Sequence, residues 1–172
     1  ACILAVFKAG CIAVPSMPLL RAGELAVIAA KAEVNAVLCA DNLRGEVEAM
    51  DLPPAARQCT LYFGPGPGPG SGSGASGADR QASGRAMLET LMAAQPAQFT
   101  AVDTAADDVC LISFTSGTTG VPKGTMHFHR DVLAICDCFP RSMLKTQADD
   151  IFIGTPPLAF TFGLGGLLLF PL

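Results

Sequence analysis

Ten residues, from Thr115 to Gly124, read TSGTTGVPKG and place four hydroxyl groups, three glycines and one lysine directly after an apolar stretch. Glycines let backbone N–H groups approach a ligand closely, hydroxyls donate hydrogen bonds, and lysine supplies a compact positive charge. Such groups suit the oxygen atoms of a polyphosphate. The segment predicts a phosphate-binding loop made of Thr115, Ser116, Gly117, Thr118, Thr119, Gly120, Lys123 and Gly124.

The spacing of this loop differs from that of a Walker loop, which requires a second glycine five residues after the first. Pro122 stands five residues after Gly117, and Thr125 stands five residues after Gly120. A P-loop kinase or ATPase is therefore disfavoured. An ordinary flexible turn between two strands is the alternative interpretation of the same residues.

The loop needs elements that hold it, and the sequence around it predicts them. Residues 109–114 read as a buried strand, residues 124–128 as the next strand and residues 129–139 as a helix that Pro140 ends or kinks. Leu133, Cys136 and Phe139 would share one side of this helix, and a last strand is expected over residues 151–154.

Helices and strands also alternate before the loop. We expect a helix over residues 1–9 closed by Gly10, a helix over 21–33, a weaker one capped by Asp41 or Asn42, and one over 85–94. Short strands are expected over residues 11–14, 34–39 and 58–63. This alternation predicts an α/β fold with a layered sheet flanked by helices.

Between residues 64 and 84 the composition changes to glycine, proline and serine. The glycine period of two excludes collagen, and such a segment has little to bury, so we expect a flexible loop within one domain that spans residues 1–172. A helix cut at its start suggests that the chain is an internal fragment of a longer protein.

Composition limits the function classes. Hydrophobic residues make up 51% of the 172 residues, charged residues only 15%, and the net charge is −4. Such a chain buries a core, which excludes a wholly disordered protein, and an acidic balance disfavours binding to nucleic acid. Residues 151–172 carry no charge, but their prolines and glycines argue against a membrane span.

Seven cysteines lie scattered through apolar stretches without metal-ligand spacing. We interpret them as small buried thiols, which predicts a cytoplasmic protein without disulfides and gives no metal-binding residues. His127 and His129 lack a third ligand nearby, so we expect one to face a ligand pocket and the other to lie near a helix start. Asp107 with Asp108, and Asp149 with Asp150, are expected to be turn or capping residues.

The full string TSGTTGVPKG closely resembles the phosphate-binding signature of the adenylate-forming superfamily, which contains acyl- and aryl-CoA ligases, luciferases and peptide-synthetase adenylation domains. Residues 4–15 and 21–39 are similar to earlier segments of that family, so the resemblance covers most of the chain. Residues 157–165, PLAFTFGLG, resemble the next family motif. Many members have a histidine where Phe160 stands, whereas ligases of the benzoate kind are similar in having phenylalanine there.

The resemblance implies a fragment of the large N-terminal domain of a benzoate- or 2-aminobenzoate-CoA ligase. Such an enzyme uses ATP with Mg²⁺ to convert a carboxylic acid to an acyl adenylate, and then transfers the acyl group to coenzyme A. Lys123 and Thr118 would act in this reaction, and Phe160, Phe162 and Gly163 would bind the aromatic ring. Phe160 and Phe162 as ordinary core aromatics remain the alternative.

Other functions stay open at this point. An aliphatic acyl-CoA synthetase or an amino-acid adenylation domain would carry the same loop, and a non-catalytic nucleotide- or phosphate-binding module is an alternative from another class. The later family motifs, which help to hold magnesium and ribose and supply a C-terminal lysine, are expected outside residues 1–172, so the fragment alone is expected to be inactive. Its partners would be the acid, ATP and CoA, with no nucleic acid or membrane, and unpaired strand edges favour self-association.

Overall fold

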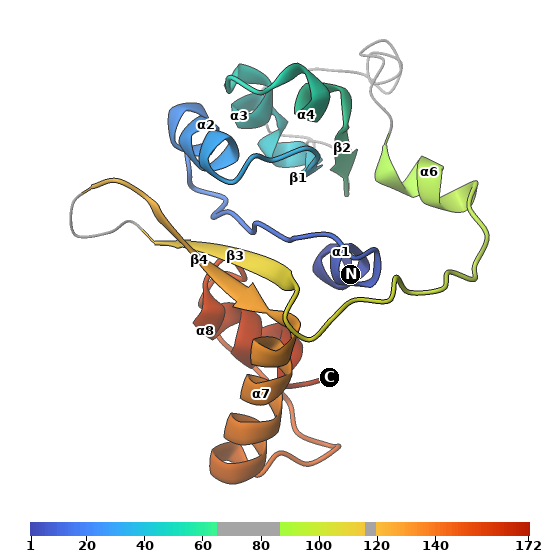
Figure 1. The fold of residues 1–172 in the computed structure, drawn as a ribbon, viewed down its shortest axis with the longest axis vertical. Helices are drawn as coiled ribbons and strands as arrows, with labels where there is room; N and C mark the ends of the chain where they lie inside the picture. The colour runs from blue at the N-terminus through green and yellow to red at the C-terminus, as the bar shows by residue number, and fades with distance from the viewer. Residues whose placement is uncertain (65–86, 116–119) are drawn as a thin grey trace. The chain divides into compact units, whose positions relative to one another are not determined.

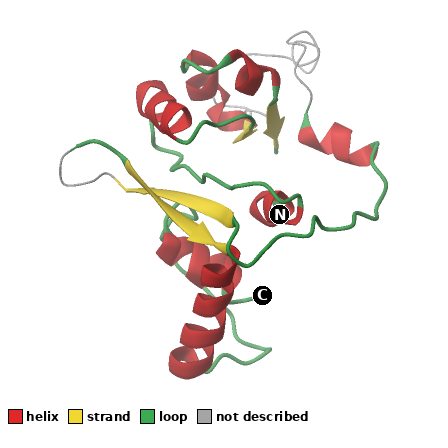
Figure 2. Ribbon diagram, in the orientation of Figure 1, coloured by secondary structure: helices red, strands yellow, loops and turns green. Residues whose placement is uncertain are grey.

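The computed structural model describes residues 1–64, 87–115 and 120–172. Within them the chain forms two compact units, each with a small sheet and several helices (Figures 1 and 2). The first unit comprises Ala1–Leu19 with Thr100–Leu172, and the second comprises Leu20–Phe99. Both units mix helices with strands, which confirms the predicted α/β class. Apart from Gly64, the predicted flexible loop over residues 64–84 lies outside the described residues.

The second unit is built around a parallel pair of strands. Its elements are α2 (Ala22–Lys31), β1 (Val37–Ala40), the 3₁₀ turn η1 (Asp41–Leu43), α3 (Arg44–Ala49), α4 (Pro54–Gln58), β2 (Thr60–Phe63) and α6 (Leu88–Ala93). A parallel pair needs a crossover connection, which α3 and α4 supply between β1 and β2. Tyr62 is fully buried at the centre of the core, where Cys39, Val47 and Ala56 belong to the same cluster.

A buried ion pair lies beside this core. The Asp41 carboxylate is almost fully buried, and an Arg44 guanidinium nitrogen lies 2.6 Å from its Oδ1 atom. The Arg44 guanidinium also lies 4.1 Å from the centre of the Tyr62 ring. Asp41 therefore pairs with Arg44 and makes no side-chain cap, whereas the prediction gave it or Asn42 a capping role.

The first unit holds the strands that flank the expected phosphate-binding loop. Its elements are α1 (Cys2–Lys8), β3 (Val109–Thr115), β4 (Lys123–Phe128), α7 (His129–Phe139), the π-helical turn η2 (Pro140–Leu144), α8 (Thr161–Leu164) and the π-helical turn η3 (Gly165–Leu169). Strands β3 and β4 are antiparallel, and the segment that follows α1 adds one parallel bridge, between Ala13 and Leu111 of β3. Cys110, Leu111 and Leu164 are almost fully buried in one core cluster.

Helix α1 ends just before Gly10, where the sequence predicts its end. Gly10 has a φ of +67°, a left-handed conformation that favours glycine. The N–H of Gly10 donates to the Phe7 carbonyl and the N–H of Cys11 donates to the Val6 carbonyl, both at 3.0 Å. These two bonds form a Schellman motif, which satisfies carbonyl groups at the helix end. The prediction that Gly10 closes this helix is therefore confirmed.

Three sequence predictions about the first unit need correction. The expected strand over residues 11–14 is only the single bridge at Ala13. The expected strand over 151–154 is wrong, because Ile151 and Ile153 are 92% and 95% exposed and this segment pairs with no described strand. An apolar run makes a strand only where a neighbouring strand takes its backbone hydrogen bonds.

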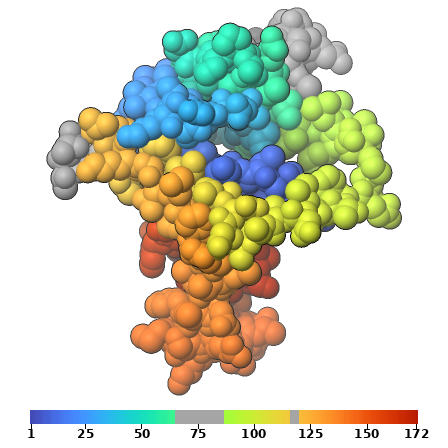
Figure 3. Space-filling view, viewed as in Figure 1, coloured from blue at the N-terminus to red at the C-terminus, as the bar shows by residue number. Residues whose placement is uncertain are grey.

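The third correction concerns the buried side of α7. Leu133 was expected to share one side of the helix with Cys136, but Leu133 is 70% exposed, whereas Val132 and Cys136 pack against the core cluster. Figure 3 shows the surface of α7, in orange, uncovered by other segments of its unit on the side towards the viewer. Among the described residues, no helix is long and apolar enough to cross a membrane.

Candidate functional site

Strand register gathers polar side chains on one face of the β3–β4 hairpin. Thr115 pairs with Lys123, Ser113 pairs with Thr125, and Leu111 pairs with His127. Side chains alternate along a strand, so residues two apart lie on one face. We call the side of the hairpin formed by Ser113, Thr115, Lys123, Thr125 and His127 its polar face.

Gly124, one of the expected loop residues, packs against side chains of β3. An added Cβ on Gly124 would lie 3.0 Å from Cγ2 of Ile112 and 3.1 Å from Cζ of Phe114. Gly124 therefore leaves room for the side chains of β3. Gly120 lies four residues before Gly124 and has a φ of +76°. This left-handed backbone conformation favours glycine.

Helix α8 brings Phe160 and Thr161 to the same region. Leu164 is 2% exposed and anchors the helix in the core. The Leu164 N–H donates to the Phe160 carbonyl at 2.8 Å, and the Phe160 N–H donates to the Pro157 carbonyl at 3.1 Å. These bonds fix the backbone of Phe160, whose side chain is 41% exposed.

A pocket of about 260 Å³ lies between the polar face and α8. Its lining comprises Ser113, Phe114, Thr115, Thr125, His127, Phe160 and Thr161. The structure thus brings together Thr115 and Phe160 from the expected site. A larger pocket of about 410 Å³ is lined by other residues: Cys136, Pro140, Arg141, Lys145, Thr146, Gln147, Leu169, Phe170 and Leu172. We place the site at the smaller pocket, because only that one touches the strand from which the TSGTTGVPKG segment starts.

Several expected site residues lie elsewhere. Lys123 is exposed at the first position of β4, opposite Thr115, and does not line the pocket. Phe162 is 77% exposed and is also not among the lining residues. Ser116, Gly117, Thr118 and Thr119 lie outside the described residues.

Gly163 lies close to the backbone of the segment before α8. An added Cβ there would lie 2.2 Å from the Pro157 carbonyl oxygen and 2.7 Å from that of Pro156. The glycine therefore allows the close approach of α8 to the backbone before it.

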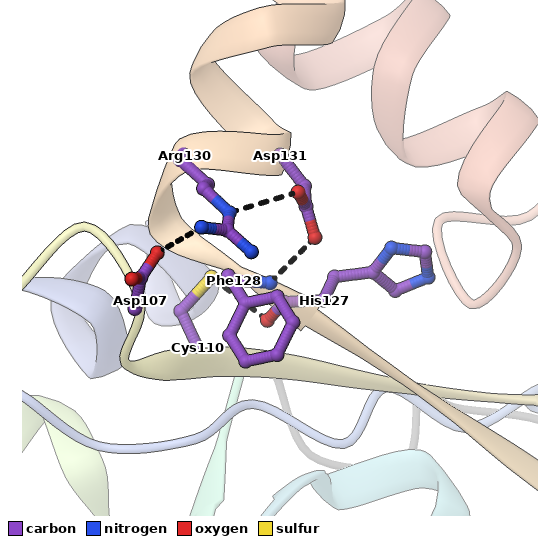
Figure 4. A network of polar contacts seen from close by, with 6 residues as sticks. All are labelled: Asp107, Cys110, His127, Phe128, Arg130 and Asp131. Carbon is purple, nitrogen blue, oxygen red and sulfur yellow. Dashed lines mark hydrogen bonds and ion pairs between the residues drawn. The ribbon is translucent and has the colours of Figure 1, made fainter.

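The two histidines have separate environments. His127 lines the pocket, and Figure 4 shows its ring pointing away from the polar contacts around Arg130. His129 begins α7 and makes an edge-on contact with the Phe7 ring, with ring centres 6.2 Å apart. This matches the expectation that one histidine faces a pocket and the other lies at a helix start.

Charged residues around the start of α7 hold the strand end in place. The Asp131 carboxylate accepts a hydrogen bond from the Phe128 N–H at 3.0 Å, and Arg130 forms an ion pair with Asp107 (Figure 4). Asp108 accepts a hydrogen bond from the Ala105 N–H at 2.8 Å. Likewise Asp150 accepts one from the Gln147 N–H. Asp107, Asp108 and Asp150 belong to turns, as predicted, and Asp131 caps the start of α7.

The seven cysteines fall into three groups by burial, and Cys2 and Cys136 form the half-buried one. Cys39 and Cys110 are buried, whereas Cys11, Cys59 and Cys138 are exposed, so the prediction of buried thiols is wrong for those three. Burial and the nearby Asp41 raise the pKa of the Cys39 thiol to about 11. Burial also raises the pKa of Cys110, whose thiol donates to the His127 carbonyl at 3.6 Å. A thiol that stays protonated is a poor nucleophile.

Sequence reasoning missed Ser113, Thr125 and Thr161. Ser113 carries a recognisable signal in the sequence, because it is a polar residue inside an apolar strand and lies two residues before Thr115. Thr125 lies opposite Ser113 in the antiparallel register. Thr161 carries no such signal, since only the folded chain brings α8 to the hairpin.

A family model described as AMP-binding enzyme matches residues 1–172, the whole chain. The chain belongs to the AMP-binding enzyme family. The chain is 38% identical over 90 residues to benzoate–CoA ligase from Thauera aromatica, a match that covers 52% of the chain and 17% of the ligase. It is 42% identical over 62 residues to anthranilate–CoA ligase from Pseudomonas aeruginosa, covering 36% of the chain and 12% of that protein.

Solved structures of AMP-binding enzymes have the same fold. The anthranilate CoA ligase AuaEII, crystallised in complex with anthranoyl-AMP, matches 98% of this chain with a TM-score of 0.81 and 25% identity. A benzoate CoA ligase from Burkholderia xenovorans LB400 matches 98% of the chain with a TM-score of 0.74 and 20% identity. The chain spans 30% and 29% of the lengths of these two structures.

Proposed function

We propose that this chain is part of an ATP-dependent aryl-CoA ligase. The enzyme would convert an aromatic carboxylic acid, benzoate or 2-aminobenzoate, to its acyl adenylate and then to a CoA thioester. The observation that carries the proposal is the pocket between the polar face and Phe160, which reaches the end of β3 at Thr115. The TSGTTGVPKG segment begins at that residue.

The first half-reaction needs positive charge and hydrogen-bond donors at the phosphates. A carboxylate oxygen attacks the α-phosphorus of ATP, the bond from that phosphorus to the bridging oxygen breaks, and pyrophosphate leaves with its electron pair. Lys123 and the hydroxyls of Ser116, Thr118 and Thr119 would offset the negative charge that grows on the leaving group. Thr115 and the glycines at 117, 120 and 124 would complete the loop.

The acid would lie in the pocket beside this loop. A space of about 260 Å³ suits a ring of benzene size, and Phe160 would contact that ring through its face or edge. Phe162 and Gly163 would shape the entrance from α8. The neighbouring relatives named for benzoate and anthranilate support an aromatic acid over other acids.

Magnesium would neutralise charge on the ATP phosphates when bound. In the described part of the chain, no three His, Cys, Asp or Glu side chains gather into a metal site. We therefore assign no magnesium ligand to these residues. In the second half-reaction the CoA thiol would lose its proton to solvent and its sulfur would attack the acyl carbon. The bond from that carbon to the phosphate oxygen would break, and AMP would leave with the electron pair.

Exchange of labelled pyrophosphate into ATP by the full-length protein tests this proposal. We expect exchange with benzoate or 2-aminobenzoate to exceed exchange with hexanoate and amino acids, and CoA addition to release AMP. Preference for hexanoate or an amino acid would favour the aliphatic or amino-acid alternatives. Nucleotide binding without exchange on any acid would favour a non-catalytic phosphate-binding module.

A further inference from the structure

The Ser113 hydroxyl is buried without a partner. Ser113 is 6% exposed, and its Oγ atom makes no hydrogen bond with any residue that the structure describes. Buried hydroxyls in folded proteins are nearly always hydrogen-bonded. A neighbour that is absent from the described chain, such as a ligand, would satisfy this atom.

Ser113 lines the pocket that the proposed function assigns to the acid. It lies two residues before Thr115 on the polar face, a separation of about 7 Å along a strand. The residues that share the pocket with it are neutral hydroxyls, two phenyl rings and one imidazole. Among the described lining residues there is no carboxylate, ammonium or guanidinium group, so the pocket suits a neutral polar group better than a second charge.

The adenylation reaction determines how the acid would be oriented in this pocket. Its carboxylate must meet the α-phosphate, and the predicted phosphate-binding loop starts at Thr115. The ring would then extend along β3 towards Ser113 and His127, with Phe160 on the side of α8. A length of about 7 Å from Thr115 to Ser113 is close to the length of a benzoic acid.

We propose that Ser113 determines specificity by hydrogen bonding to an amino or hydroxyl substituent on the ring of the acid. This inference rests on the proposed function and narrows its substrate class to aromatic acids with such a substituent. A hydroxyl fits this task because it can both donate and accept a hydrogen bond. A site with a buried polar group discriminates against an analogue that cannot pair with it, since the group then stays unsatisfied.

The test compares the full-length wild-type protein with Ser113→Ala in pyrophosphate exchange on benzoate, 2-aminobenzoate and 2-hydroxybenzoate. Wild type should prefer at least one substituted acid over benzoate. Ser113→Ala should lower kcat/KM for that acid by about 10-fold and change benzoate by less than about 2-fold. Ser142→Ala makes the same chemical change at an exposed position of η2 and should leave all three values unchanged.

Two further measurements keep the outcome clear. Ser113→Ala removes an unpaired buried hydroxyl, so its Tm should equal or exceed that of wild type. Ser113→Cys keeps a weaker hydrogen-bonding group of similar size and should lie between wild type and Ser113→Ala in its preference.

Failure of this inference is distinct from failure of the proposed function. A wild-type protein that adenylates none of the three acids overturns the proposed function and this inference with it. Exchange on these acids with an unchanged preference in Ser113→Ala overturns only the role of Ser113. An equal loss on all three acids with a raised KM for ATP also overturns it, because Ser113 would then serve the nucleotide.

Discussion

Replacing Gly163 by alanine should disturb the pocket through α8. The added Cβ would lie 2.2 Å from the Pro157 carbonyl oxygen, whereas ordinary van der Waals contact begins at 3.4 Å. The backbone must therefore shift by roughly 1 Å. The same Pro157 carbonyl accepts the Phe160 N–H, so this shift strains the bond that fixes Phe160.

The expected cost combines two effects. Overpacking in a well-packed region costs about 1–3 kcal/mol. Weakening one hydrogen bond adds about 1 kcal/mol, which gives a total of roughly 2–4 kcal/mol. Because Phe160 and Thr161 line the pocket, the KM for the acid should rise as well as the protein becoming less stable.

Gly166→Ala provides the matched control. An added Cβ at Gly166 meets no atom within 4 Å, and this glycine also lies in a helical turn. Alanine there should stabilise the fold by about 0.5–1 kcal/mol. Tm and acid-dependent pyrophosphate exchange of both full-length variants check the prediction. Equal Tm values for Gly163→Ala and Gly166→Ala would refute the packing argument.

Three other variants or treatments give direct tests. Lys123→Ala should raise the barrier to adenylation by about 1–3 kcal/mol, which lowers the rate in the exchange assay by roughly 5- to 150-fold. Unchanged kinetics would show that Lys123 has no role in the reaction. With a pKa of about 11, Cys39 should have roughly a hundredfold less thiolate at about pH 8 than a thiol of pKa 9.0, so mass spectrometry should find it alkylated far more slowly than exposed Cys138. Hydrogen bonds from the Arg21 side chain and the Ala22 N–H hold the pKa of Glu46 below 4.5, so its stabilising effect is present above that pH and is lost as the pH falls below it. Glu46→Gln should therefore flatten the acid side of a plot of Tm against pH, and an unchanged slope would contradict this.

Elements closed by local signals were predictable from the sequence. Gly10 ends α1 because glycine reaches the left-handed conformation easily, and helix α7 runs from His129 to Phe139 as predicted, with Pro140 directly after it. Such signals act within a few residues, so one sequence is enough to read them. The two strands on either side of the TSGTTGVPKG segment were equally readable, because both lie next to a glycine-rich connection, whereas their antiparallel pairing comes from the structure.

Features that depend on distant neighbours were not predictable in this way. Residues 151–154 have the apolar character of a strand, yet no described strand pairs with them. Val132 lies on the buried side of α7, whereas Leu133 is exposed. Helical spacing shows which residues share a side, but the position of the core determines which side is buried. Thr161 reaches the pocket only after α8 has docked through Leu164.

The glycines show why residue types alone did not define the site. Gly124 in the loop and Gly163 in α8 were predicted to contact a ligand. The structure gives both of them another reason: Gly124 accommodates Phe114, and Gly163 accommodates the backbone at Pro157. Ser113 shows the reverse, since a residue in a buried strand has a hydroxyl that the strand itself does not use. Gly124 and Gly163 therefore leave room for atoms of the chain itself, whereas the buried Ser113 hydroxyl, which the chain leaves unpaired, is the group from which we infer a ligand contact.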